Sequence, residues 1–115
     1  MPSTTDFRRG DVVLVSFLFA DESGTKVRPA LVISSARYHR ARREAIVAAI
    51  TSNVRRRLVG DHAVLQWKTA GLLFPSVVTG VIRTIERTMI RRRLGALTST
   101  DMRSVEVAVR QSLNL

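Results

Sequence analysis

The sequence of 115 residues has no cysteine, few aromatic residues and fewer than half as many acidic as basic residues. Without cysteine there is no disulfide scaffold, no thiolate zinc site and no thiol nucleophile. The longest apolar stretch, residues 12–20, is interrupted by Ser16 and is too short to span a bilayer. The N-terminus lacks the cationic start and apolar run of a signal peptide. We therefore expect a cytoplasmic protein with no membrane association.

Positive charge, by contrast, is abundant. Nineteen basic residues against nine acidic ones give a formal net charge of +10, and only Lys26 and Lys68 are lysines. The arginines gather in three groups, which comprise Arg37, Arg40, Arg42 and Arg43, then Arg55 to Arg57, and then Arg87 with Arg91 to Arg93. One such group is usually a solvated surface, but three of them at a pI of about 11.7 favour a polyanionic partner. Duplex-DNA motifs are missing, so single-stranded nucleic acid fits better.

Hydrophobic periodicity predicts five short strands, with a helical turn or two between the second and third strands. We place the strands over residues 12–20, 29–35, 45–51, 62–67 and 76–85, and the helical turn within residues 36–44. Residues 21–26 carry turn chemistry. Pro29 cannot donate a backbone hydrogen bond, so we expect it at the first position of its strand or on a sheet edge. Gly80 indicates a bulge or bend in the fifth strand.

The C-terminal segment changes to a helical period. Thr98 and Asp101 are spaced as an N-cap and its partner, and an apolar stripe follows at Met102, Val105, Val109 and Leu113. Strands followed by one amphipathic helix predict an α+β fold, in which a small curled sheet or barrel packs against the helix. We expect residues 1–115 to form a single domain.

The residues for acid–base or metal chemistry are sparse. Carboxylates are scattered along the chain, for example at Asp11, Asp21, Glu22 and Asp61, so we expect neither a metal nor another cofactor. His39 lies in a cationic group, and His62 opens a strand, where we expect a surface residue. RNA can also cleave itself when its 2′-hydroxyl is aligned and the developing charge is stabilised. Arg28 and Thr51 could do this, although periodicity alone makes them a surface cation and a strand-end residue.

Five segments of the sequence support RNA cleavage more strongly. They are RGDVVLV (9–15), VRPALVIS (27–34), VAAITS (47–52), IRTIE (82–86) and RLGAL (93–97). Together with the closing helix, and over residues 7–115, they resemble the MazF/PemK family of bacterial toxin ribonucleases. Short pieces such as RGD are weak signals. RPALVIS followed by AAITS and a late IRTIE is specific.

The resemblance implies an SH3-like β-barrel of about five to seven strands, of the CcdB/MazF type, with a C-terminal amphipathic helix and a homodimeric assembly. It implies the toxin half of a type II toxin–antitoxin pair, neutralised by a cognate acidic antitoxin. Such toxins are metal-independent, sequence-specific endoribonucleases (mRNA interferases). They cleave single-stranded RNA by attack of the 2′-hydroxyl and leave a 2′,3′-cyclic phosphate and a 5′-hydroxyl.

The family's catalytic arginine falls on Arg28 and its catalytic threonine on Thr51. Residues 20–27 match the family's mobile loop beside the RNA groove. The RNA-binding residues that the resemblance implies are Glu22, Lys26, Ser52, Asn53 and Ser76.

One region departs from the family. The segment SVVTGV before IRTIE is about one residue shorter than in better-known members and lacks their acidic and glutamine side chains. This departure keeps a non-catalytic RNA-binding barrel open as an alternative. A gyrase-poisoning toxin stays open as well, because that family shares the barrel fold.

Overall fold

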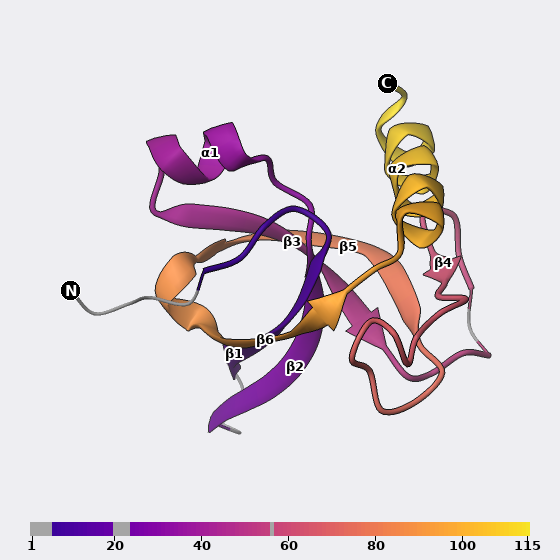
Figure 1. Cartoon of the computed structure of the whole chain (residues 1–115), viewed down its shortest axis with the longest axis horizontal. Helices are drawn as coiled ribbons and strands as arrows, with labels where there is room; N and C mark the ends of the chain where they lie inside the picture. The colour runs from indigo at the N-terminus through magenta and orange to yellow at the C-terminus, as the bar shows by residue number, and fades with distance from the viewer. Residues whose placement is uncertain (1–5, 20–23, 56) are drawn as a thin grey trace.

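A curved antiparallel sheet forms the framework of the protein (Figure 1). The computed structural model describes residues 6–19, 24–55 and 57–115. Within these ranges the sheet has six strands in the order β4-β5-β3-β2-β1-β6. The strands are β1 (Asp11–Phe19), β2 (Gly24–Val32), β3 (Glu44–Thr51), β4 (His62–Ala63), β5 (Val77–Glu86) and β6 (Ile90–Ala96). This architecture confirms the predicted fold class.

The barrel is open, because β4 and β6 are sheet edges that do not pair with each other. The chain after β4 bridges the two edges instead. A methyl group on Gly71 would come within 2.2 Å of the Leu94 carbonyl oxygen, and one on Gly95 within 2.5 Å of the Ala70 carbonyl oxygen. The two backbones can approach this closely only because both glycines lack a side chain.

Two helices and one 3₁₀ turn complete the described part of the chain. The helix α1 (Ala36–Ala41) joins β2 to β3, and η1 (Arg87–Met89) joins β5 to β6. The C-terminal helix α2 (Ser99–Leu113) packs near β4 and β5, and Thr98 caps it as predicted by accepting a hydrogen bond from the Asp101 amide at 3.2 Å. Val105 and Ala108 are buried, whereas Leu113 is exposed, so the apolar stripe is shorter than predicted. Neither helix in the described ranges has the length and apolarity needed to cross a membrane.

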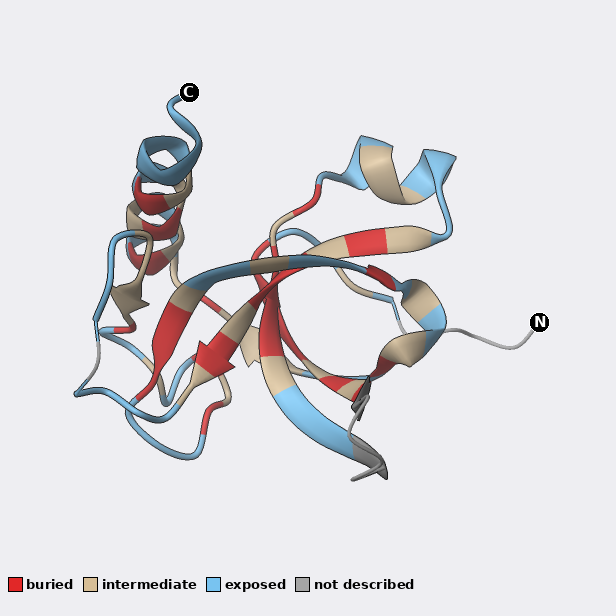
Figure 2. Cartoon of the chain, turned by 180° about the vertical axis from the view of Figure 1, so that it is seen from behind, coloured by how far each residue is buried: buried red, intermediate tan, exposed pale blue. Residues whose placement is uncertain are grey.

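The buried residues of the strands form two apolar cores. Figure 2 marks the buried stretches of the strands in red. The helix-side core comprises Val12, Leu31, Ala48, Ile50, Val64, Ala70, Leu72, Val78, Leu97 and Val105. The inner core comprises Val13, Val15, Phe17, Ala30, Val32, Ala45, Val47, Ile85 and Ile90. The neighbouring residues Val12 and Val13 of β1 therefore enter different cores, one on each face of the strand.

The second strand begins earlier than predicted. Residues 24–28, expected as turn and strand lead-in, pair with β1, with Lys26 opposite Phe17 and Gly24 opposite Phe19. The prediction for Pro29 is wrong, because this residue lies inside β2, and β2 lies between β1 and β3. Pairing with β3 starts only at Ala30, so Pro29 lies where the β3-facing side of β2 is still unpaired.

Two further strand predictions need correction. The fourth strand, expected over residues 62–67, ends at Ala63, because the amides of Leu65 and Gln66 donate to the Asp101 carboxylate and the chain turns. The sixth strand was missed, because its exposed residues Arg91 to Arg93 hide any apolar alternation. Charged side chains are typical of a sheet edge, where they discourage pairing with other chains.

The bulge expected at Gly80 is confirmed. Ala48 pairs with Ile82 and Ile50 with Val78, so Ala49 alone faces three residues of β5. The Asp61 carboxylate accepts a hydrogen bond from the Gly80 amide at 2.9 Å. The bulge is thereby tied to the loop before β4.

Candidate active site

A cavity of about 780 Å³ opens on the sheet near the middle of β2 and the end of β3. Five of the strands and the segment after β4 contribute to it. Its polar lining residues are Arg28, Arg83, Arg92, Thr51, Ser52 and Ser76, and its aromatic lining residues are Phe17 and Phe74. The lining residues within the described ranges include no carboxylate and no histidine. The cavity therefore combines positive charge, hydroxyl groups and aromatic surface, which suits a single-stranded polyanion with bases.

Arg28 and Thr51 both line this cavity. Each lies two residues beyond Ala30–Ala49, the last pair between β2 and β3. Arg28 is exposed, and its Nη1 donates to the Val27 carbonyl oxygen at 3.2 Å. Thr51 is half-buried, and its Oγ1 accepts from the Asn53 amide at 3.1 Å. Because the Thr51 oxygen is the acceptor, its own hydrogen remains to be donated.

Two further groups in the cavity were not singled out from the sequence. Arg83 pairs in register with Val47, which lies on the same sheet face as Thr51, and its guanidinium lies 5.0 Å from the centre of the Phe17 ring. Arg92 reaches the cavity from β6. In the sequence, Arg83 lies in the IRTIE segment and Arg92 in the third arginine group, where neither differs from a surface cation. Only the curvature of the sheet brings them to the cavity.

The predicted RNA-binding residues divide into three sets. Ser52 and Ser76 line the cavity, Ser52 exposed and Ser76 buried, with the Ser76 hydroxyl donating to the Phe74 carbonyl oxygen at 2.7 Å. Lys26 and Asn53 are exposed and lie outside the cavity lining. Glu22 lies outside the described residues.

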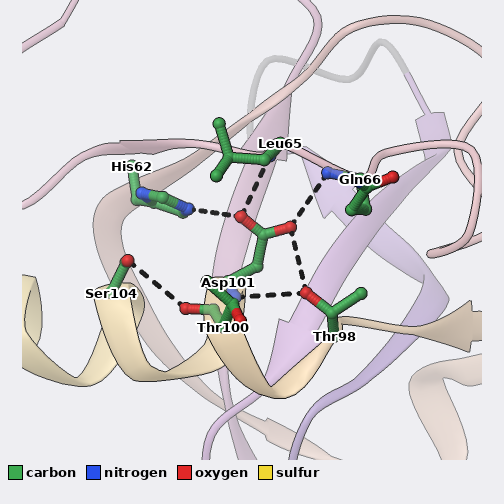
Figure 3. Close-up of polar contacts among 7 residues, drawn as sticks. All are labelled: His62, Leu65, Gln66, Thr98, Thr100, Asp101 and Ser104. Carbon is green, nitrogen blue, oxygen red and sulfur yellow. Dashed lines mark hydrogen bonds and ion pairs between the residues drawn. The ribbon is translucent and has the colours of Figure 1, made fainter.

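Neither histidine belongs to this site. His39 packs edge-on against Phe7, with 4.8 Å between ring centres, and its Nε2 lies 2.5 Å from Ser34 Oγ. Burial, with Arg87 contributing, lowers the pKa of His39. The prediction for His62 as a surface residue is wrong, because its side chain is only 16% exposed and its Nε2 lies 2.8 Å from Asp101 Oδ1 (Figure 3).

Asp101 is a fully buried carboxylate in the first turn of α2. Burial alone would raise the pKa of Asp101, but hydrogen bonds from the Leu65 and Gln66 amides and from His62 lower it below its ordinary value. The side chain is therefore ionised at neutral pH. No group of three or more metal-ligating side chains occurs in the part of the chain that the structure describes. The expectation of a metal-independent reaction stays a prediction.

Comparison with known proteins identifies the family of this chain. The sequence model of the family described as "PemK-like, MazF-like toxin of type II toxin-antitoxin system" matches residues 8–113. A comparison with curated proteins found no match.

Solved structures share the fold. An endoribonuclease from a mycobacterial species, in complex with its cognate antitoxin, is 21% identical with a TM-score of 0.76, over 96% of this chain and 97% of that one. The Mycobacterium tuberculosis toxin MazF-mt6 is 24% identical with a TM-score of 0.75, over 91% and 97% of the two chains. A chain of a MazE–MazF crystal structure from Deinococcus radiodurans is 18% identical with a TM-score of 0.73, over 96% and 99%. The family resemblance noted in the sequence is thereby confirmed, and this chain belongs to the PemK-like, MazF-like toxins of type II toxin–antitoxin systems.

Proposed function

We propose that this toxin is an endoribonuclease that cuts single-stranded RNA without a metal, in the cytoplasm, at the site formed by Arg28 and Thr51. The observation that carries the proposal is that both residues line one cationic cavity, each two residues beyond the last pair between β2 and β3. Structural relatives described as endoribonucleases support the same activity.

The chemistry follows from what RNA supplies itself. The 2′-hydroxyl oxygen attacks the adjacent phosphorus, an O2′–P bond forms and the P–O5′ bond breaks. The 2′-hydroxyl loses its proton and the leaving 5′ oxygen gains one, so the products are a 2′,3′-cyclic phosphate and a 5′-hydroxyl. The protein must align these atoms and stabilise the extra negative charge on the phosphate oxygens.

Arg28 and Thr51 have complementary roles in this step. A guanidinium keeps its protons in proteins and donates in a fork that matches a phosphate, so Arg28 stabilises charge and does not take the 2′-hydroxyl proton. The Thr51 hydroxyl donates its remaining hydrogen to a non-bridging oxygen and orients the phosphate. Arg83, Arg92 and Ser52 then contact the flanking nucleotides.

The partner of the toxin follows from the same surface. A cavity lined by three arginines suits an acidic segment as well as RNA, so we expect the cognate antitoxin to bind there through carboxylates. Relatives of known structure include toxins in complex with antitoxins. Homodimerisation remains a proposal based on the family resemblance.

The experiment is cleavage of several single-stranded RNAs by purified protein in EDTA, with circular dichroism to confirm folding of each variant. We expect cleavage by the wild type, loss of cleavage in Arg28→Ala, and unchanged cleavage in Arg103→Ala, a matched exposed arginine on α2 outside the cavity lining. RNA that is bound but stays intact would overturn the proposal in favour of an RNA-binding module. Toxicity with intact RNA and damaged DNA would favour a gyrase poison.

A further inference from the structure

Asp101 uses its carboxylate to hold a distant segment of chain (Figure 3). Its Oδ1 accepts from His62 Nε2 at 2.8 Å and from the Leu65 amide at 2.9 Å. Its Oδ2 accepts from the Gln66 amide at 3.0 Å and lies 3.4 Å from Thr98 Oγ1. Three of these donors, those of His62, Leu65 and Gln66, belong to β4 and the chain directly after it. The Asp101 side chain is 0% exposed.

Helix capping does not explain this arrangement. In a capping box the acidic side chain returns to the amide of its own N-cap residue. Here the Asp101 amide donates to Thr98, while the carboxylate reaches amides that lie 35 and 36 residues earlier in the chain. A buried charge costs free energy unless it is paired and hydrogen-bonded, and these bonds supply that compensation.

The segment held by Asp101 leads directly to the cavity. Residues 65–76, the wall segment, begin at the two amides that Asp101 binds and end at Ser76 in the cavity lining. Within the segment, the Leu72 amide donates to Trp67, and Gly71 packs against the Leu94 carbonyl of β6. The wall segment is therefore fixed by α2 at its start and by β6 in its middle.

Two adjacent large apolar side chains near the end of the wall segment are exposed. Leu73 is 82% exposed and Phe74 is 62% exposed, and both line the cavity. The Ser76 hydroxyl donates to the Phe74 carbonyl oxygen at 2.7 Å and so fixes the backbone that carries this ring. An exposed aromatic ring beside arginines is the arrangement on which bases of single-stranded nucleic acid stack.

We propose that Asp101 is a positioning residue of the toxin: it sets the wall segment so that Phe74 stacks on a base of the RNA bound at Arg28 and Thr51. This inference rests on the proposed function. Because Phe74 would contact the substrate equally in the ground state and the transition state, loss of its position should weaken binding and leave the chemical step unchanged.

The test is a double-mutant cycle on Asp101→Asn and Phe74→Ala. Asp101→Asn directs an NH₂ group at a backbone amide and keeps the size of the side chain. The probe is an oligoribonucleotide that carries a cleavage site mapped with the wild type, and its form with a 2′-deoxy nucleotide at that site reports binding alone. We expect each single change to raise KM and the Kd of the deoxy probe about tenfold, with kcat within about twofold of wild type. The double variant should be no weaker than either single variant.

Glu106→Gln is the matched control, because Glu106 lies on the same helix and makes only a half-exposed ion pair with Arg9. It should leave KM unchanged. Effects that multiply to about a hundredfold in the double variant would overturn the proposal, as would a folded Asp101→Asn with wild-type KM. If Asp101→Asn does not fold, His62→Leu removes one of the bonds to Asp101 and should raise KM in the same direction. His62→Gln retains a donor and should restore the wild-type value.

Hydrogen exchange gives a readout that does not depend on activity. In Asp101→Asn the Leu65 and Gln66 amides should exchange faster while β3 amides keep wild-type protection. A wild type that binds single-stranded RNA but cuts none would refute the proposed function, and the cycle on the Kd for that intact RNA would still decide the role of Asp101. A wild type that neither binds nor cuts would refute both.

Discussion

Arg28 on β2 and Thr51 on β3 each lie two residues beyond Ala30–Ala49, the last pair of these strands, and both line the same cavity. Both residues lie on the sheet face that carries the inner core. Further along the two strands this face is covered by buried apolar residues, whereas at these two residues it lines the cavity. The end of pairing thus creates both the opening and the place for a charged residue and a hydroxyl. This relationship has direct consequences for mutants.

Thr51→Val should abolish most of the chemistry while keeping the shape of the side chain. The hydroxyl that orients the phosphate is lost, so kcat should fall about a hundredfold, with KM little changed. Thr51→Ser keeps the hydroxyl and should retain most of the activity. Single-turnover cleavage of a mapped oligoribonucleotide measures this, and cleavage by Thr51→Val at the wild-type rate would contradict the assigned role.

The cavity arginines should govern the salt dependence of RNA binding. Removing one phosphate contact lowers the slope of log K against log salt concentration by about 0.7 for a single strand. Arg83→Ala and Arg92→Ala should each show this change, whereas Arg103→Ala should not. Fluorescence titrations of the deoxy probe over a range of salt concentrations provide the measurement. Equal slopes in all variants would show that neither arginine contacts the backbone.

Gly71→Ala should destabilise the fold more than Gly10→Ala. Both glycines have positive φ, 83° and 95°, so each substitution carries a backbone cost of about 1 kcal/mol or more. Only at Gly71 does the new methyl group also meet backbone, 2.2 Å from the Leu94 carbonyl oxygen, while at Gly10 the nearest atom is Met102 Sδ at 4.0 Å. Urea unfolding compares the free energies of unfolding. A Gly71→Ala no less stable than Gly10→Ala would mean that the wall segment and β6 do not pack as described.

His39 should make the protein less stable on mild acidification. Burial, with Arg87 contributing, lowers the pKa of His39 in the folded state, so the unfolded chain binds more protons below the ordinary pKa of 6.5. Stability contributed by neutral His39 is complete above that value and is lost as pH falls toward the lowered folded pKa. His39→Gln removes the titration, so its free energy of unfolding should fall less than that of the wild type between about pH 7 and about pH 5.5. An identical fall in both proteins would contradict this assignment.

The sequence predicts the elements whose residues follow one period. β1, β3, β5 and α2 were found within one or two residues of their structural bounds, because apolar positions recur there at strand or helix spacing. β6 was missed, because it buries Ile90 while Arg91 to Arg93 face solvent. The fourth strand was predicted too long, because a carboxylate on α2 takes the amides that the strand would have used.

The candidate site was likewise predicted from the sequence only in part. The family resemblance gave Arg28 and Thr51, and both line the cavity beyond the last pair of β2 and β3. Phe17, Arg83 and Phe74 come together only through sheet curvature and the wall segment, which no local pattern records. The prediction for His62 failed for the same reason, since its partner Asp101 lies 39 residues further along the chain.

The most direct test of the central claim is the chemistry of the cut ends. A mapped oligoribonucleotide and its copy with one 2′-deoxy nucleotide at the cleavage site are incubated with wild-type protein in EDTA, and the product ends are identified by mass spectrometry. The account predicts a 2′,3′-cyclic phosphate and a 5′-hydroxyl from the ribonucleotide, and an intact deoxy copy. A 5′-phosphate product, or cleavage of the deoxy copy at the same position, would contradict it.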